Sequence, residues 1–253
     1  MVQQLPYCGS APLPGELLSR FNPDPVLIAF LIAACALQLL MLQRRGGSDV
    51  RRRQGFSLAG WLVAAAALLS PLCALSVALF SARVGQHMVL ILVAAPLIAM
   101  GLPRAPAWHH GARLWVSSGV FFAALWYWHM PVPYDATFRS TWIYWAMHLT
   151  LFGSGIFLWR ELLDHPARQT AQALAAGTLT FMQMGLLGAV LTLAERSMFQ
   201  WHLITTQVWG LTPLQDQQLG GAIMWVPGIV LFLCIAVRSL GHLWQSIERA
   251  RPA

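Results

Sequence analysis

The sequence predicts an all-α integral membrane protein, a bundle of seven transmembrane helices in which residues 1–253 form one membrane domain. Of the 253 residues, 57% are hydrophobic and only 10% are charged, whereas soluble domains carry about 25% charged residues. Several apolar runs reach the roughly 20 residues that a helix needs to cross the hydrocarbon core of a bilayer. The net charge of +7 comes from arginine alone. Because the arginines lie mostly in short connections, they indicate membrane orientation, and we expect no nucleic-acid partner.

The first three spans are expected near residues 25–43, 56–77 and 86–102. The first follows a Pro-rich tail, residues 1–24, and the second follows a connection that holds five arginines. The third opens at the polar sequence GQHM and continues through VLILVAAPLIAMGL. The boundary between the second and third spans stays open, because the chain remains apolar as far as Phe80.

The other four spans are expected near residues 114–130, 142–159, 171–193 and 219–238. A short loop separates the fourth from the fifth, an arginine-bearing connection separates the fifth from the sixth, and a longer loop precedes the seventh. The chain then ends in a tail at 239–253. No repeat or separate soluble domain interrupts this pattern.

The arginines predict an orientation for the bundle. One set of connections holds four of them, Arg20, Arg83, Arg139 and Arg196, while the alternate connections and the C-terminal tail hold the other twelve. Positive residues stay on the cytoplasmic side of a membrane. We therefore expect the N-terminus outside and the C-terminus in the cytoplasm.

Side chains that can bind metal gather at the expected outer face. His87 opens the third span, His129 closes the fourth, and His148 lies about seven residues into the fifth, roughly 10 Å below the outer boundary. Five further candidate ligands are expected at the same face: Met88, Cys73, Asp135, Asp216 and Met224. Thiolate, thioether and imidazole suit Cu(I), while imidazole with carboxylate suits Cu(II). The set therefore favours copper among metals.

Simpler explanations exist for most of these residues. Histidine and tryptophan at a membrane interface anchor helices, and methionine in an apolar helix usually fills space. Cys8 and Cys73 both face the oxidising side, so a disulfide between them is as good an explanation as copper binding. His148 differs, because ionisable residues below the interface are costly and usually functional. Tyr144, four residues earlier on the same helical face, could hold its second ring nitrogen.

The sequence favours no enzymatic activity. It contains no CxxC or HExxH motif, no phosphate-binding loop and no nucleophile elbow. Glu195 and Asp216 flank the long outer loop without an acid–base companion at recognisable spacing. We therefore expect a protein that is not an enzyme.

Four stretches resemble a known family: YCGSAPLPGELLSRFNPDP, GQHMVLILVAAPLIAMGLP, WHMPVPYDATFRSTWIYWAMH and PLQDQQLGGAIMWVPG. In their order and their positions relative to the spans, they resemble the caa3-type cytochrome c oxidase assembly factor family, the polytopic CtaG proteins. The resemblance covers nearly the whole chain and implies a multi-pass protein of the bacterial inner (plasma) membrane. It points to the residues His87, His129, Asp135, His148, Asp216 and Met224.

The resemblance implies a role in maturing a haem–copper oxidase, through copper delivered to the catalytic subunit. Three other functions stay open. The chain could be a metal-free accessory subunit of the oxidase. It could hold a b-type haem, because two histidines facing each other from separate spans can ligate one. It could also import copper, although its polar residues in the inner half, such as Gln183, form no evident path across the membrane.

Overall fold

The computed structural model describes residues 5–103, 110–165 and 169–250, and the outermost residues of both predicted tails lie outside this range. The part of the chain so described is helical and contains no strand, which confirms the all-α class. Its α-helices are α1 (Pro25–Arg45), α2 (Val50–Leu69), α3 (Pro71–Ala78), α4 (Phe80–Met88), α5 (Ala95–Gly101), α6 (His110–Trp128), α7 (Pro131–Ala136), α8 (Thr141–Leu163), α9 (Thr170–Leu193) and α10 (Pro213–Ala250).

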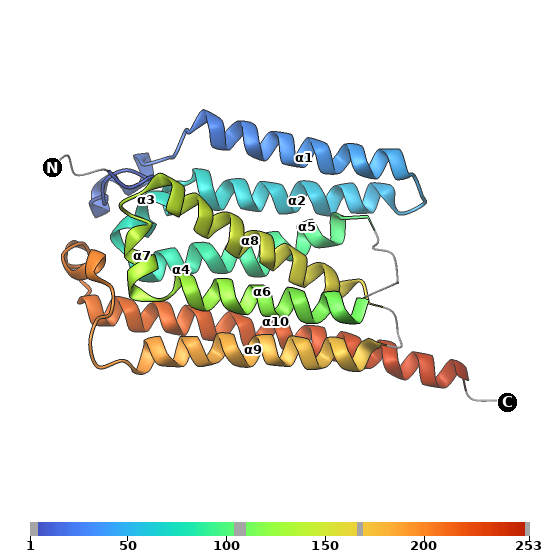
Figure 1. The fold of residues 1–253 in the computed structure, drawn as a ribbon. Helices are drawn as coiled ribbons and strands as arrows, with labels where there is room; N and C mark the ends of the chain where they lie inside the picture. Colours follow the sequence, from blue (N-terminus) through green and yellow to red (C-terminus); the bar gives the residue numbers. More distant parts are fainter. Residues whose placement is uncertain (1–4, 104–109, 166–168, 251–253) are drawn as a thin grey trace.

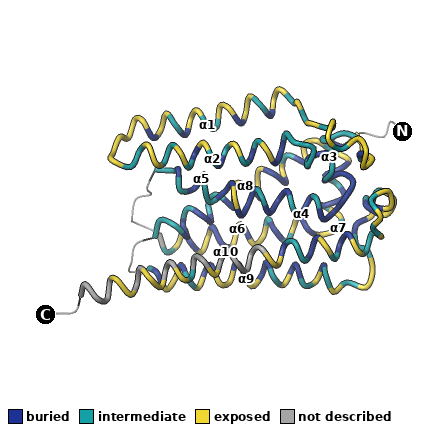
Figure 2. Tube along the Cα trace, turned by 180° about the vertical axis from the view of Figure 1, so that it is seen from behind, coloured by how far each residue is buried: buried dark blue, intermediate teal, exposed yellow. Residues whose placement is uncertain are grey.

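Seven long helical segments run side by side in the described part of the chain, each antiparallel to the next (Figure 1). They are α1, α2, the continuous segment from α4 to α5, α6, α8, α9 and α10. The N-terminal tail, α3, α7 and the α9–α10 loop gather at one end of the bundle. The α1–α2 connection and the C-terminus lie at the other end. Dark-blue buried stretches concentrate in the middle of the bundle, along α4 and α8 (Figure 2).

Among the residues that the structure describes, three helical segments are long and apolar enough to cross a membrane: α1, the Phe80–Gly101 segment and α9. A fourth crossing results if α2 and α3, which bend by 50° at their junction, count as one span. Helices α6, α8 and α10, with 19, 23 and 38 residues, are long enough to cross but are not among these candidate spans. A membrane protein is therefore supported, while seven crossings and their orientation remain predictions.

The break between the second and third segments lies earlier than the sequence suggested. The chain leaves helical geometry at Leu79 (φ −126°, ψ 132°), and α4 starts at Phe80, six residues before the expected position 86. The sequence predicted Arg83 in a loop. The structure places it inside α4, where it is 1% exposed. The last helix is also longer than expected, since α10 continues to Ala250 through most of the predicted tail.

Two glycines let α10 approach its neighbours closely. A Cβ atom on Gly221 would lie 2.6 Å from the carbonyl oxygen of Gly188 in α9, and one on Gly220 would lie 2.5 Å from the ring of Phe80. Only a residue without a side chain permits such backbone approach. The close contact at Gly220–Gly221 places the start of α10 against α9 and against the start of α4.

A π-helical turn, Val89–Ala94, lies between α4 and α5, directly after His87 and Met88. In this turn carbonyl groups pair with N–H groups five residues later. The Ile91 carbonyl would then need the N–H of Pro96, which proline lacks. The indole Nε1–H of Trp159 in α8 donates to that carbonyl instead, at 2.7 Å. The π-turn therefore depends on a side chain from another helix.

We expect Trp159→Phe to lower the free energy of unfolding by about 1–3 kcal/mol, the cost of a buried acceptor without a partner. Phenylalanine keeps an aromatic ring at this fully buried position and removes the N–H. Thermal unfolding in detergent measures the effect. Trp142→Phe is the matched control, because the Trp142 side chain is 86% exposed. Equal unfolding midpoints for both variants would contradict this role.

Candidate metal centre

Three of the predicted ligands converge in the middle of the bundle. His87 comes from α4, His129 follows the last residue of α6, and His148 lies in α8. The centroid of the His87 ring lies 5.3 Å from that of His148 and 6.0 Å from that of His129. All three residues are buried, with at most 4% exposure. We call these three residues the histidine cluster.

Backbone carbonyls set the protonation of two cluster rings. His129 Nδ1 lies 2.7 Å from the Leu125 carbonyl oxygen, and His148 Nδ1 lies 3.0 Å from that of Tyr144. A carbonyl only accepts, so in both rings Nδ1 carries the hydrogen. This assignment leaves Nε2 with a free electron pair, as in histidines that bind metals.

The cluster also contains unpaired polar atoms. Among the described residues, His148 Nε2 and both ring nitrogens of His87 are buried without a hydrogen-bond partner. Buried polar groups of this kind are few in proteins and call for an explanation, one of which is an ion. At a metal–nitrogen distance of about 2.0–2.1 Å, two imidazoles on one ion have centroids roughly 5–6 Å apart. The ring separations fit this range.

The described residues nevertheless contain no preformed metal site. Within them, no group of three or more His, Cys, Asp or Glu side chains has the arrangement that holds an ion. The three rings are neighbours, but they do not form a closed coordination sphere. Binding would require the rings to turn toward a common point.

The two predicted acidic ligands hold backbone instead. Asp216, at the start of α10, accepts hydrogen bonds from the backbone N–H groups of Phe80 and Ser81 and from the Ser81 hydroxyl. It thereby caps the start of α4. Asp135 in α7 accepts from the N–H groups of Gln200 and Trp201 in the α9–α10 loop. The geometry gives both carboxylates a structural role.

The three predicted sulfur ligands also have other surroundings. Met88 and Met224 are 5% and 0% exposed and belong to the main hydrophobic core. Cys73 forms a disulfide with Cys8. In this state Cys73 has no thiolate to offer, and the disulfide alternative raised by the sequence is the one that the structure contains.

Arg83, one helical turn before His87, is a site residue that the sequence interpretation missed. Its guanidinium lies over the ring of Phe138, at 4.0 Å from the centroid, and donates to the Thr137 hydroxyl at 2.8 Å. A cation–π contact of this kind makes burial of arginine tolerable. The four-residue spacing between Arg83 and His87 is the signal that could have revealed it.

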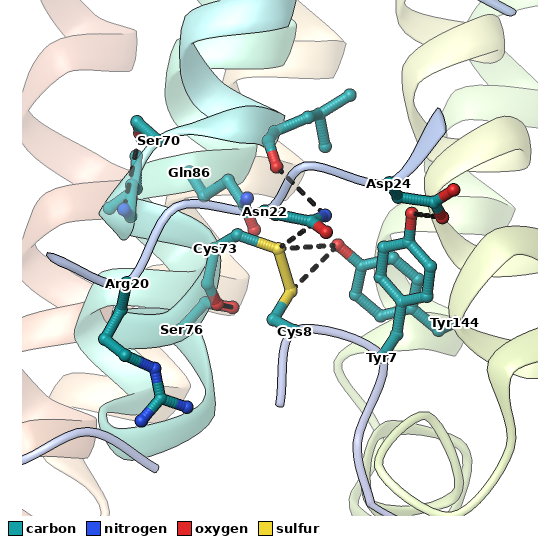
Figure 3. Close-up of a disulfide and its surroundings, with 12 residues drawn as sticks. Tyr7, Cys8, Arg20, Asn22, Asp24, Ser70, Cys73, Ser76, Gln86 and Tyr144 are labelled. Atoms are coloured by element: carbon teal, nitrogen blue, oxygen red, sulfur yellow. Dashed lines mark hydrogen bonds between the residues drawn. A yellow bond between two sulfur atoms is a disulfide. The ribbon is translucent and has the colours of Figure 1, made fainter. Parts of the chain in front are cut away.

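Tyr144 contacts His148, but not in the predicted way. Its backbone carbonyl, rather than its phenol, holds His148 Nδ1, while the two ring centroids lie 4.2 Å apart. The phenol oxygen points away, toward the disulfide, at 3.5 Å from Cys8 Sγ and 3.8 Å from Cys73 Sγ (Figure 3). Tyr144 therefore lies between the disulfide and the histidine cluster.

His202 belongs to a separate buried contact in the α9–α10 loop. Its Nδ1 donates to the Ala78 carbonyl at 3.2 Å, so its Nε2 accepts from the Tyr134 hydroxyl at 2.8 Å. Burial and the nearby charge of Arg83 lower the pKa of His202 to about 3. This neutral ring fastens the loop to the end of α3 and to α7.

Comparison with known proteins places most of the chain in a family. A family model described as cytochrome c oxidase caa3 assembly factor matches residues 33–246. Neither the curated proteins nor the solved structures contain a match.

We expect Asp216→Asn to lower the free energy of unfolding by about 2 kcal/mol, because it removes a charged acceptor of buried hydrogen bonds. Thermal unfolding in detergent measures this loss. Glu195→Gln is the matched control, because Glu195 is an exposed carboxylate in the α9–α10 loop. An unchanged midpoint for Asp216→Asn would show that the cap is dispensable.

Proposed function

The chain belongs to the cytochrome c oxidase caa3 assembly factor family, and we propose that it matures the oxidase by delivering copper. In this proposal the histidine cluster binds the ion, and the catalytic subunit of the oxidase receives it. The observation that carries the proposal is the convergence of three buried imidazoles, two of which, His87 and His148, have ring nitrogens without a hydrogen-bond partner. The oxidase is proposed as the partner because of the family, and copper binding is proposed because of the histidine cluster.

The charges around the cluster favour Cu(I) over Cu(II). Asp135 and Asp216, the carboxylates predicted as ligands, are committed to backbone N–H groups. Arg83 adds a buried positive charge one turn from His87. The free-energy cost of burying an ion rises steeply with its uncompensated charge, and repulsion from Arg83 is twice as large for a divalent ion. Imidazole ligands alone also serve a soft monovalent ion.

We further propose that all seven long helical segments cross the bacterial inner membrane, with the N-terminus outside. With Arg83 buried, the expected outer connections retain only Arg20, Arg139 and Arg196, while twelve arginines remain for the cytoplasmic side. The positive-inside asymmetry thus becomes larger. In this orientation the histidine cluster lies toward the outer leaflet.

The depth of the cluster suggests how copper leaves. His148 lies seven residues beyond the start of α8, within the buried centre of the bundle. An acceptor that meets the bundle from within the bilayer could take the ion without exposing it to bulk water. This supports a transfer between two membrane-embedded proteins.

The test is copper per chain in purified protein. We expect about one Cu(I) per chain in the wild type under anaerobic loading, weaker retention of Cu(II), and loss of most copper in His87→Ala/His148→Ala. His165→Ala is the matched control, because His165 lies just beyond the C-terminal end of α8, which ends at Leu163, whereas His148 lies in the first half of that helix. The same variants are scored for copper content of the oxidase purified from cells.

Two outcomes would contradict the proposal. Equal copper in the double variant and the wild type would mean that the cluster is not the site. Bound iron with an intense visible absorption band would indicate a b-type haem instead.

A further inference from the structure

The Cys8–Cys73 disulfide joins the N-terminal tail to α3 beside the histidine cluster (Figure 3). The two cysteines are 65 residues apart in sequence, with Cα atoms 5.5 Å apart. Cys73 is fully buried, whereas Cys8 is half-buried and belongs to a segment without regular helix. One sulfur therefore comes from the bundle and the other from a tail that the bond itself holds in place.

The tail covers the outer approach to the cluster. Tyr7 stacks on Tyr144, with ring centroids 4.7 Å apart, and meets the edge of Trp145 at 5.0 Å. Its hydroxyl donates to Asp24, which caps α1. Beneath Tyr7, the ring of Tyr144 packs on His148. Tyr7, Tyr144 and His148 thus form a continuous series of ring contacts from the tail to the cluster, with the disulfide beside the Tyr144 hydroxyl.

We propose that the reduced pair, Cys8 and Cys73, is a second copper site, a two-thiolate Cu(I) site that receives the ion and passes it to His148. This inference rests on the proposed function of the cluster. Two soft thiolates suit Cu(I), and the side chain of Tyr144 contacts both sulfur atoms through its hydroxyl and the ring of His148 through its face.

The surroundings of Cys73 favour its thiolate. The side-chain amide of Asn22 lies 3.6 Å from Cys73 Sγ, and the Tyr144 hydroxyl lies 3.8 Å from it. Both groups can donate to sulfur, and donors directed at a charged form stabilise that form. A thiolate at this buried position therefore has two hydrogen-bond donors before any metal arrives.

The cycle requires a dithiol reductant as co-reactant. The reductant gives two electrons and two protons to the S–S bond, which becomes two thiols, while the reductant becomes a disulfide. Cu(I) then replaces the two thiol protons. Transfer to the imidazoles exchanges ligands and leaves copper as Cu(I), and the thiolates take up two protons. A disulfide acceptor of the same class re-forms the bond by accepting two electrons and two protons.

The experiment uses full-length protein with Cys35→Ser and Cys234→Ser, so that the pair supplies the only thiols of the four cysteines in the sequence. One half is reduced with a dithiol that is then removed, and the other half stays oxidised. Both are titrated anaerobically with Cu(I) against a chromophoric chelator, and thiol labelling records how many sulfurs are reduced. The same titration is applied to Cys8→Ser and to His87→Ala/His148→Ala in this background.

We expect the reduced protein to bind about one more Cu(I) than the oxidised protein, with sulfur neighbours in its X-ray absorption spectrum. Cys8→Ser should lose this increment, and His87→Ala/His148→Ala should keep it while losing the copper of the oxidised form. Copper equal in both redox forms, or a bond that resists the dithiol, would overturn the second site and leave a structural disulfide. Histidine-dependent copper in the oxidised form tests the proposed function separately: its absence counts against the cluster and against transfer to His148, whereas the redox-dependent increment tests the two-thiolate site.

Discussion

The hydrogen bonds from Phe80 and Ser81 to Asp216 are the contact on which the centre of the bundle depends. They start α4 at a position where the preceding chain is apolar and could have continued as helix. Because Asp216 belongs to the first turn of α10, the same bonds couple the last helix to the central one. The starting residue sets the rotation of α4 about its own axis, and this rotation directs Arg83 and His87 into the interior.

The helical class and the identity of the three histidines follow from the sequence, because apolar run length and the cost of buried imidazole are local properties. The break at Leu79 could not be found in this way. It depends on a carboxylate 136 residues away from Phe80 along the chain. The roles of Asp135 and Asp216 failed for the same reason, since their partners are backbone groups on distant segments. A carboxylate can ligate a metal ion or accept hydrogen bonds from backbone N–H groups, and only the three-dimensional structure shows which of these roles it has.

A few hydrogen bonds and ring contacts hold the polar side chains in the apolar interior of the bundle. Backbone carbonyls one turn earlier hold His129 and His148, so each ring needs no other side chain on that edge. Aromatic faces and one hydroxyl hold Arg83. For His148 this leaves Nε2 without a partner on the side of the cluster. Under the proposed function, a site with so few fixed ligands would exchange an ion more readily than retain it.

The π-turn divides the central helical segment into two parts, α4 before the turn and α5 after it. Its second half, α5, packs closely on α2, because Gly60 lies against the backbone at Ile98 and Gly101 lies against Ser57. Its first half, α4, is tied to α10 through Asp216 and carries His87 two residues before the wider turn Val89–Ala94. The wider turn therefore sets the rotation between two anchored halves, and with it the direction in which His87 faces the other two histidines.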